Sequence, residues 1–280
     1  MQISERRPLS LEELQSLARA CRRDALTMIF QAGSGHPGGS LSVMDILVAL
    51  FFSHMRLRPN DPYWPERDYF ILSKGHAAPA LYSVMAQAGF FPEAELQTLR
   101  HLNSRLQGHP DRVRLPGIEA STGSLGQGLS IAQGLALAAQ RDGSPSRTFC
   151  VLGDGECQEG QIWEVALSAP KFNLEKLVVF IDANGGQIDG PVEKVLPLEP
   201  LVSKWKACRW NTLEIDGHDY NALAQALQKT TTKAPQSSPW LIVARTIKGK
   251  GVSFMENNMK WHGSAPQAEQ YAQAMEELRG

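Results

Sequence analysis

Two glycine-rich segments of the chain each place an oxygen-bearing side chain directly after a run of apolar residues. The run RTFCVLG is followed by Asp154 within GDGECQEG, and the run KLVVFID is followed by Asn184 within IDANGGQIDG. Carboxylate and amide oxygens are ligands that suit Mg²⁺ or Ca²⁺. The neighbouring glycines allow the backbone to approach a diphosphate closely. Asp154 and Asn184 are therefore candidate ligands of a divalent cation.

Taken separately, each of these segments is typical of an ordinary turn after a strand. The pair is more informative, because Gly153 and Asn184 are 184 − 153 = 31 positions apart, which is enough for one helical crossover between neighbouring strands. In doubly wound sheets, ligands bind at the carboxyl ends of the strands. We therefore expect both side chains at one edge of a sheet.

Four of the seven histidines lie in segments rich in glycine or proline. They are His36 in SGHPGG, His76 in SKGHAAP, His109 in QGHPD and His262 in WHGSAP. A single histidine in such a loop is more often an ordinary surface residue, and four of them shift that expectation only moderately. Imidazole moves protons near neutral pH, so these residues are candidates for catalysis if they meet at one site.

The elements that would position these groups alternate between helices and strands. Apolar residues at helical spacing predict a helix from Ser10 to Gly33, and further helices are expected over 41–52, 75–89, 125–141, 219–231 and 265–280. Short runs rich in Val, Ile and Leu predict strands over 68–73, 147–153, 176–182, 210–216 and 239–245. The last four are expected to be buried on both faces. This alternation predicts an α/β fold with a doubly wound, mostly parallel sheet and helices on both faces, forming a single domain over residues 1–280.

Composition excludes several classes of protein. The 280 residues are 42% hydrophobic and 20% charged, with 28 Lys and Arg against 29 Asp and Glu, so the net charge is −1. Without a basic excess, no nucleic-acid partner is expected. No apolar run reaches the length of a membrane span, and the N-terminal MQISERRPLS lacks the apolar stretch of a secretory leader. The four cysteines form no C-x-x-C pair, which favours a cytoplasmic location.

The pairing of GDG with a later asparagine resembles the cofactor motif of the thiamine diphosphate enzymes. Five further strings resemble the N-terminal half of transketolase and occur in that family's order: SGHPGGSLS, SKGHAAPALY, QGHPDRVRLPGIEASTGSLGQGLS, TIKGKGVSF and WHGSAP. The resemblance covers roughly residues 10–266, nearly the whole chain.

The resemblance implies a thiamine diphosphate-binding fold, with thiamine diphosphate and Mg²⁺ (or Ca²⁺) as cofactors. By resemblance, the metal ligands are Asp154, Asn184 and the backbone carbonyl of Gly186. The resemblance also implies that the cofactor is held by His76, Gly123, Ser124, Leu125, Asp154, Gly155, Asn184 and His262. The catalytic residues that it implies are His36, His76, His109, His262 and Glu159. Glu159 would belong to a proton-linking network between active sites, although a carboxylate at a helix start has an equally good structural role. His54, His101 and His218 match no position of the family and are expected to be ordinary surface residues.

The chain departs from the family pattern in two places. Gly186 stands where the family usually has Ile or Leu, and it removes an apolar side chain beside the cofactor. Ser124 stands where transketolases often have Pro. The order of glycines in STGSLGQG, after a loop, does not match a dinucleotide fingerprint, so NAD is disfavoured. The KGKG string at 248–251 is either a phosphate-facing loop or a solvated basic turn.

Full-length transketolases continue with a pyrimidine-binding domain and a C-terminal domain. The resemblance therefore implies a split enzyme, in which this chain needs a partner, a C-terminal transketolase-like subunit, with which it forms a heterotetramer of two such pairs. The expected reaction moves a two-carbon ketol unit from a ketose donor to an aldose acceptor, with sugar phosphates as substrates. The alternatives are a 1-deoxyxylulose-5-phosphate synthase-like subunit, a 2-oxo acid dehydrogenase E1 α-type subunit, and a non-catalytic paralogue.

Overall fold

Five parallel strands form the centre of the computed structural model, which describes residue 7, residues 9–232 and residues 237–279. The sheet has the order β1-β2-β3-β7-β6. Its strands are β1 (Tyr69–Leu72), β2 (Thr148–Gly153), β3 (Leu177–Ala183), β7 (Trp240–Arg245) and β6 (Asn211–Asp216). The N-terminal segment MQISERRPLS, which lacks the pattern of a secretory leader, lies mostly outside the described residues.

The apolar runs become strands because both of their faces are covered. All seven residues of β3 are buried, and β2 and β7 are buried at every position but the last. The same expectation is wrong for β6, whose residues are half-buried or exposed. Strand β6 lies at the edge of the sheet and pairs only with β7, so neighbouring elements cover less of it.

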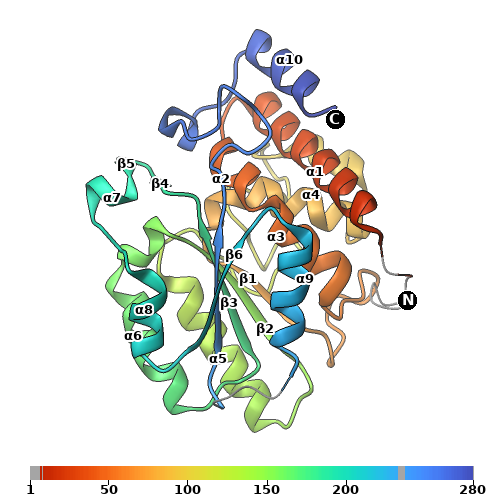
Figure 1. The fold of residues 1–280 in the computed structure, drawn as a ribbon. Helices are drawn as coiled ribbons and strands as arrows, with labels where there is room; N and C mark the ends of the chain where they lie inside the picture. Colours follow the sequence, from red (N-terminus) through yellow and green to blue (C-terminus); the bar gives the residue numbers. More distant parts are fainter. Residues whose placement is uncertain (1–6, 8, 233–236, 280) are drawn as a thin grey trace.

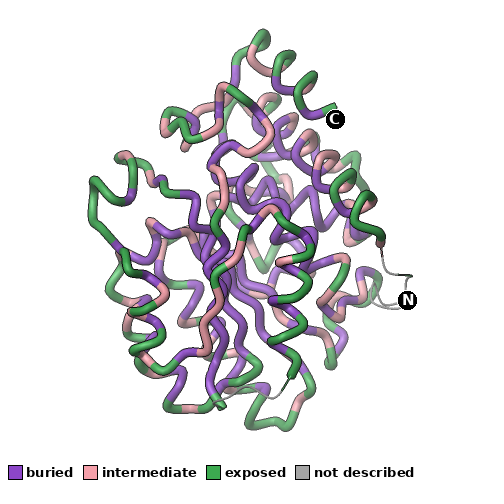
Figure 2. Tube along the Cα trace, viewed as in Figure 1, coloured by how far each residue is buried: buried purple, intermediate pink, exposed green. Residues whose placement is uncertain are grey.

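Helices cover both faces of the sheet, which confirms the doubly wound architecture (Figure 1). One face packs against α1 (Leu11–Ala32), α3 (Met44–Ala49), α4 (Ala78–Ala88) and α9 (Tyr220–Lys229). The other packs against α5 (Gln127–Arg141), α6 (Gly160–Lys171) and α8 (Leu201–Ala207). Figure 2 shows the buried strands at the centre and the exposed outer sides of these helices.

Helix α1 begins and ends where the sequence predicts. The Ser10 side chain accepts a hydrogen bond from the backbone N–H of Glu13 at 3.2 Å, and the Glu13 carboxylate accepts one from the Ser10 N–H at 2.7 Å. This reciprocal pair is a capping box. The helix ends at Gly33, whose φ of 60° is left-handed. Among the described residues, no helix combines the length and apolar character needed to cross a bilayer.

The predicted helix over 41–52 is wrong in its bounds. Helix α2 (Pro37–Ser42) already begins within the SGHPGG string, α3 follows after Val43, and the segment Leu50–His54 (η2) is a π-helix. Proline is favoured at the first position of a helix, which explains the early start. A side chain at Gly38 would lie 2.9 Å from the Trp261 carbonyl oxygen, so close packing rather than loop flexibility accounts for this glycine.

The remaining elements are short and lie mainly around the carboxyl edge of the sheet. They are η3 (Gly75–Ala77), η4 (Glu93–Thr98), η5 (Gly155–Gln158), the hairpin of β4 (Gly186–Gln187) and β5 (Gly190–Pro191), α7 (Val192–Val195), η6 (Met259–His262) and α10 (Ala268–Glu277). In Figure 1, the hairpin and α7 stand out from the body of the molecule, while α10 lies beside α1.

Candidate active site

The two candidate metal ligands meet at the carboxyl edge of the sheet, as predicted. Strands β2 and β3 are neighbours, with Gly153 opposite Asp182, so Asp154 follows β2 beside the end of β3. The Asp154 carboxylate accepts hydrogen bonds from the backbone N–H groups of Gly155 at 2.9 Å and Gly185 at 2.6 Å. The Asn184 side-chain oxygen accepts one from the Gly186 N–H at 3.1 Å.

Asp154 is a buried carboxylate whose hydrogen bonds come from these uncharged backbone groups. Burial raises its pKa to about 6, and the neighbouring Asp182 charge adds to the effect. A carboxylate in this state gains from a cation placed against it. Among the described residues, no group of three or more His, Cys, Asp and Glu side chains could hold a metal, so a metal site here would depend on amide and carbonyl oxygens as well.

A cleft of about 460 Å³ opens at this edge of the sheet. It brings together most of the residues predicted from the sequence: His36, His76, His109, Gly123, Leu125, Asp154, Gly155, Glu159, Asn184, Gly186 and His262 all line it. Ser124 is the exception. Its residue is exposed and does not line the cleft, whereas Gly123 and Leu125 on either side do.

The four histidines converge although up to 226 positions (262 − 36) separate them in the chain. The His36 ring centroid lies 5.1 Å from that of His76, 5.5 Å from that of His262 and 6.4 Å from that of His109. The His76 and His262 rings are 5.3 Å apart. The Nδ1 atoms of His36 and His262 are buried without a hydrogen-bond partner in the described part of the chain. Buried polar atoms are rarely left unpaired, so these nitrogens are suited to a bound ligand.

All four imidazoles are neutral at pH 7. Burial, together with nearby positive charge, lowers the pKa of His36 to about 4 and that of His262 to about 3. The pKa of His76 lies well below its usual value, again mainly because of burial, and the pKa of His109 is also lowered. Imidazole titrates near neutral pH in water, and the sequence does not show the desolvation that lowers these pKa values. His36, His76 and His262 are half-buried and His109 is exposed.

A buried ion pair lies beneath the cleft and joins four elements of the fold. Asp182 is fully buried and accepts hydrogen bonds from the Lys74 ammonium, from the Ser42 hydroxyl at 2.6 Å, from the Thr246 hydroxyl and from the Asn184 amide at 3.1 Å. Lys74 also donates to the Gly39 carbonyl at 3.0 Å. Burial alone would raise the pKa of Asp182, but Lys74 and the hydrogen bonds outweigh it and lower that pKa. The network holds Asn184 against α2 and the ends of β3 and β7.

The TIKGKG segment contributes a second buried lysine. Lys248 is 1% exposed, and its ammonium donates a hydrogen bond to the Gly186 carbonyl at 3.1 Å. Burial and the nearby Lys74 charge lower the pKa of Lys248 to about 8. The solvated-turn interpretation is therefore wrong for Lys248, which lines the cleft and provides a cation for an anionic ligand.

Two glutamates of GDGECQEG have different environments. Glu156 is buried, accepts hydrogen bonds from the N–H groups of Gly126 at 2.9 Å and Gly153 at 3.1 Å, and also contacts the Ser73 hydroxyl. It ties the 123–126 loop to the end of β2. Glu159 is exposed, precedes α6 as its N-cap and reaches the rim of the cleft.

Gly123 shows why this loop needs glycine. Its φ is +155°, and an added Cβ would lie 2.9 Å from Cδ2 of the His109 ring. The backbone of the loop can therefore lie directly against His109.

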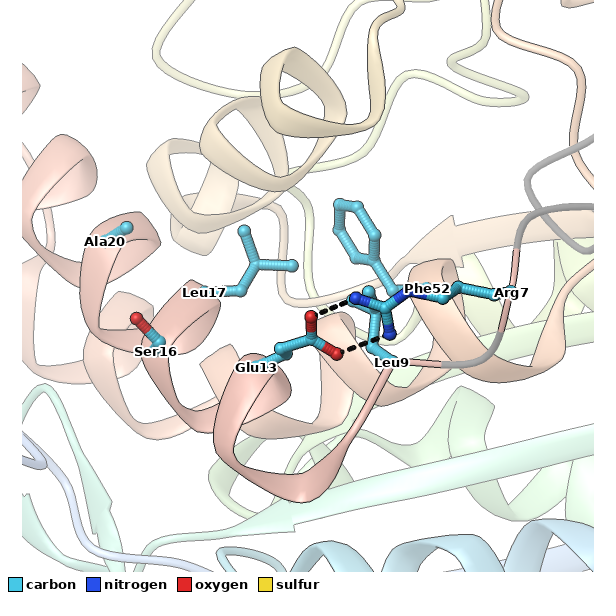
Figure 3. A pocket seen from close by; sticks show the side chains of 7 residues that line it. All are labelled: Arg7, Leu9, Glu13, Ser16, Leu17, Ala20 and Phe52. Atoms are coloured by element: carbon cyan, nitrogen blue, oxygen red, sulfur yellow. Dashed lines mark hydrogen bonds and ion pairs between the residues drawn. The ribbon is translucent and has the colours of Figure 1, made fainter.

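A second hollow, of about 430 Å³, lies beside the first turns of α1 (Figure 3). None of the four histidines of the cleft lines it. It is lined by Arg7, Leu9, Glu13, Ser16, Leu17, Ala20 and Phe52. Its charged groups, Arg7 and Glu13, pair with each other. This hollow lacks the convergent polar groups of the cleft, so the cleft is the candidate active site.

Sequence reasoning did not identify Lys74, Glu156 or Asp182 as parts of the site, and it left Lys248 open between a phosphate-facing loop and a solvated turn. Lys74 could have been suspected from its place two residues before His76. The expectation for His218 is also wrong: it donates from Nδ1 to the buried Asp45 carboxylate at 2.7 Å and accepts the Ile247 N–H at 2.9 Å.

His54 is likewise not an ordinary surface residue, because it accepts a hydrogen bond from Arg147 at 2.6 Å and is half-buried. His101 is exposed, as expected.

An α/β sheet whose carboxyl edge combines an acid–amide pair, a histidine cluster and buried lysines defines a binding domain for an anionic cofactor. Comparison with known proteins gives the family. The model of the family described as "Transketolase, thiamine diphosphate binding domain" matches residues 14–279. The chain belongs to this family, which confirms the resemblance drawn from its motifs.

The relatives include both short and long chains. The 6-deoxy-6-sulfo-D-fructose transketolase subunit SqwG of Clostridium sp. (strain MSTE9) is 44% identical, over 95% of this chain and 96% of the relative. An apulose-4-phosphate transketolase subunit of Phocaeicola vulgatus is 38% identical, over 96% of this chain and 95% of the relative. The solved transketolase of Campylobacter jejuni superimposes with a TM-score of 0.90 at 31% identity, covering 97% of this chain but 43% of that one. The chain thus spans nearly the full length of these transketolase subunits and about two fifths of the longer enzyme.

Proposed function

We propose that this chain is the diphosphate-binding subunit of a two-chain transketolase and acts as one diphosphate-binding domain. The observation that carries the proposal is the meeting of His36, His76, His109 and His262 over Asp154 and Asn184 in one cleft. The reaction moves a two-carbon ketol unit from a ketose to an aldose. When bound, thiamine diphosphate supplies the electron sink that allows the carbon–carbon bond beside a carbonyl to break.

The residues of the cleft fit this cofactor and a divalent metal. Asp154, the Asn184 side-chain oxygen and the Gly186 carbonyl form a set of hard oxygen ligands suited to Mg²⁺ or Ca²⁺. Lys248 and the neutral histidines His76 and His262 provide hydrogen-bond donors for the diphosphate. Gly123, Leu125 and Gly155 line the cleft, so the cofactor would lie against this part of the chain.

The neutral imidazoles determine how protons are handled. His36, His109 and His262 act as hydrogen-bond partners of substrate hydroxyls, because their lowered pKa values leave them uncharged at pH 7. A neutral imidazole can accept a hydroxyl proton at one nitrogen and return it later.

A partner subunit completes the site, and a second copy of this chain completes the assembly. The two short relatives are both named as subunits, and the longer transketolases carry additional chain beyond the matched region. Helices α5 and α6 expose Ile131 and Leu167, at 37% and 69%, on their outer sides. Gly134 lies in the interior of α5 with no described atom within 4 Å of an added Cβ. Glycine in an exposed helix costs about 1 kcal/mol relative to alanine, a cost that close approach of another helix would explain.

These features support a heterotetramer in which α5 and α6 pack against the same helices of a second copy, a self-complementary interface. Glu159, at the start of α6, lies between this surface and the cleft and would link the two active sites. All four cysteines are free thiols, which supports a cytoplasmic location.

The substrates are ketoses and aldoses with a terminal anionic group. The names of the two short relatives give one phosphorylated sugar and one sulfonated ketose. For this chain we propose sugar phosphates as the first substrates to test.

The test is a ketol-transfer assay of the chain co-purified with a chain that carries the pyrimidine-binding half. Xylulose 5-phosphate and ribose 5-phosphate serve as donor and acceptor, with thiamine diphosphate and Mg²⁺ present. We expect transfer only with both chains, loss of transfer in Asp154→Ala, and full activity in the exposed control His101→Ala. Turnover of pyruvate instead of the ketose would favour a synthase-like or E1-type subunit. A stable complex that binds no cofactor would point to a non-catalytic chain.

A further inference from the structure

Position 186 is occupied by glycine for reasons of space and not of backbone conformation. Gly185 has a φ of +76°, in the left-handed region, but Gly186 does not have a positive φ. Gly186 lies in strand β4 and pairs with Pro191 of β5, in backbone geometry that any residue can adopt. The missing side chain therefore needs another explanation.

The space of that side chain is already filled by Met259. A Cβ added at Gly186 would lie 2.7 Å from Cε of Met259, closer still to its sulfur, and 3.0 Å from Cδ of Lys248. The two contacts with Met259 are shorter than real Cβ atoms show, so any side chain at 186 would displace the flexible end of Met259. The methionine thus occupies from a distant segment the volume that a residue at 186 would otherwise take.

Met259 is held in this position by a well-anchored turn. It begins η6, whose N-cap is Asn258, and the Asn258 amide donates a hydrogen bond to the Phe254 carbonyl at 3.2 Å. Trp261 is 3% exposed and donates from its indole nitrogen to the same carbonyl at 3.0 Å. Residues three apart in a 3₁₀ turn lie above one another, so Met259 shares a side of η6 with His262, which lines the cleft.

The residues around the space of the missing side chain are part of the cleft wall. Gly186 and Lys248 line the cleft, and the Lys248 ammonium donates to the Gly186 carbonyl at 3.1 Å. A thioether is flexible and polarizable, which suits it to packing against both a backbone and a lysine stem. Its removal would leave a gap behind the pair.

We propose that Met259 is a positioning residue of the cofactor site: its thioether replaces the side chain absent at position 186 and holds the Gly186 carbonyl and Lys248 at the wall of the cleft. The inference rests on the proposed function, because it concerns the affinity of the site for thiamine diphosphate. It also accounts for the departure of Gly186 from the family pattern, since Gly186 and Met259 form one compensating pair.

The test is a swap of the two side chains, with thiamine diphosphate and Mg²⁺ as the probe. Binding is measured by titration calorimetry on the two-chain complex, and the thermal midpoint is measured on each variant without cofactor. We expect Met259→Ala to weaken binding about tenfold by opening a gap, and Gly186→Leu to weaken it at least as much by steric overlap. The double variant Gly186→Leu/Met259→Ala should bind within about threefold of the wild type, because the leucine then fills the gap.

Two control variants separate positioning from general stability. Met259→Leu conserves volume and should keep the affinity within about twofold. Met275 in α10 is half-buried like Met259, so Met275→Ala should lower the thermal midpoint but leave the dissociation constant unchanged. Unchanged affinity in Met259→Ala would overturn the role of Met259. So would a double variant whose affinity for thiamine diphosphate falls by the product of the two single-variant factors. A wild-type complex that binds no thiamine diphosphate would instead refute the proposed function.

Discussion

The substitution Asp182→Asn tests the buried ion pair beneath the cleft. Lys74 and Asp182 are 1% and 0% exposed, so neither charge is solvated by water. In the variant, the Lys74 ammonium loses its carboxylate partner and keeps the Gly39 carbonyl at 3.0 Å as an uncharged acceptor. The NH₂ group of the new amide would also face groups that now donate hydrogen bonds to the carboxylate, such as the Ser42 hydroxyl, and it cannot accept from them.

Removing one partner of a buried ion pair costs about 3–5 kcal/mol, because it leaves an uncompensated charge. The free energy of unfolding of a typical protein is about 5–15 kcal/mol, so this loss is a large share of the total. Lys74→Met alone should cost a similar amount, since it leaves the Asp182 carboxylate buried without its cation. Combining the two substitutions should cost clearly less than the sum of the single losses.

The assay is urea unfolding of the cofactor-free chain, followed by tryptophan fluorescence, for the wild type, both single variants and the double variant. Thiamine diphosphate affinity is measured in parallel, because Asn184 donates to Asp182 and would lose its orientation. A loss below about 1 kcal/mol in Asp182→Asn, or strictly additive losses in the double variant, would refute the reasoning, since that is the behaviour of a solvated surface pair.

Three other contacts make predictions of their own. Gly123→Ala places a methyl group 2.9 Å from the His109 ring, so kcat of the two-chain complex should fall about ten- to a hundredfold; unchanged kinetics would contradict the close approach. Gly134→Leu fills the proposed contact between copies, and light scattering should show the assembly halving in mass, with no change if α5 faces solvent. Burial would raise the pKa of Asp45, but Arg22 lowers it to about 2 from 3.8, so its stabilisation is present at neutral pH and is lost as pH falls from about 4 towards 2. Asp45→Asn should therefore lower the unfolding free energy at pH 7 by about 2 kcal/mol, with a difference that shrinks in acid.

Much of the fold could be predicted because it depends on local patterns. The apolar runs that became β2, β3 and β7, and the Ser10 and Gly33 boundaries of α1, follow from side-chain period and capping chemistry within a few residues. The exposed character of β6 could not be predicted, because the order of strands in the sheet is a long-range property. The close packing of Gly38 against Trp261 could not be predicted either, because the two residues are far apart in the chain.

The candidate site divides in the same way. Asp154 and Asn184 were accessible to sequence reasoning, because each directly follows a strand and parallel strands align their carboxyl ends. The burial of Lys74 and Lys248 was not, since a lysine in a glycine-rich motif looks the same whether it faces water or lies beneath a cleft. Ser124 was assigned to the cofactor with its neighbours, but its residue turned out to be exposed.

The sequence by itself determined the chemistry that the chain carries: an acid and an amide at two strand ends, four histidines in family motifs, and a sheet able to present them. These depend on residue identity and local spacing, which the order of residues contains directly. The tertiary structure alone decided the environment of those groups. Packing of the whole fold lowers the pKa of His36, pairs Lys74 with Asp182 and places Met259 against Gly186, because each of these environments joins segments that are far apart in the chain.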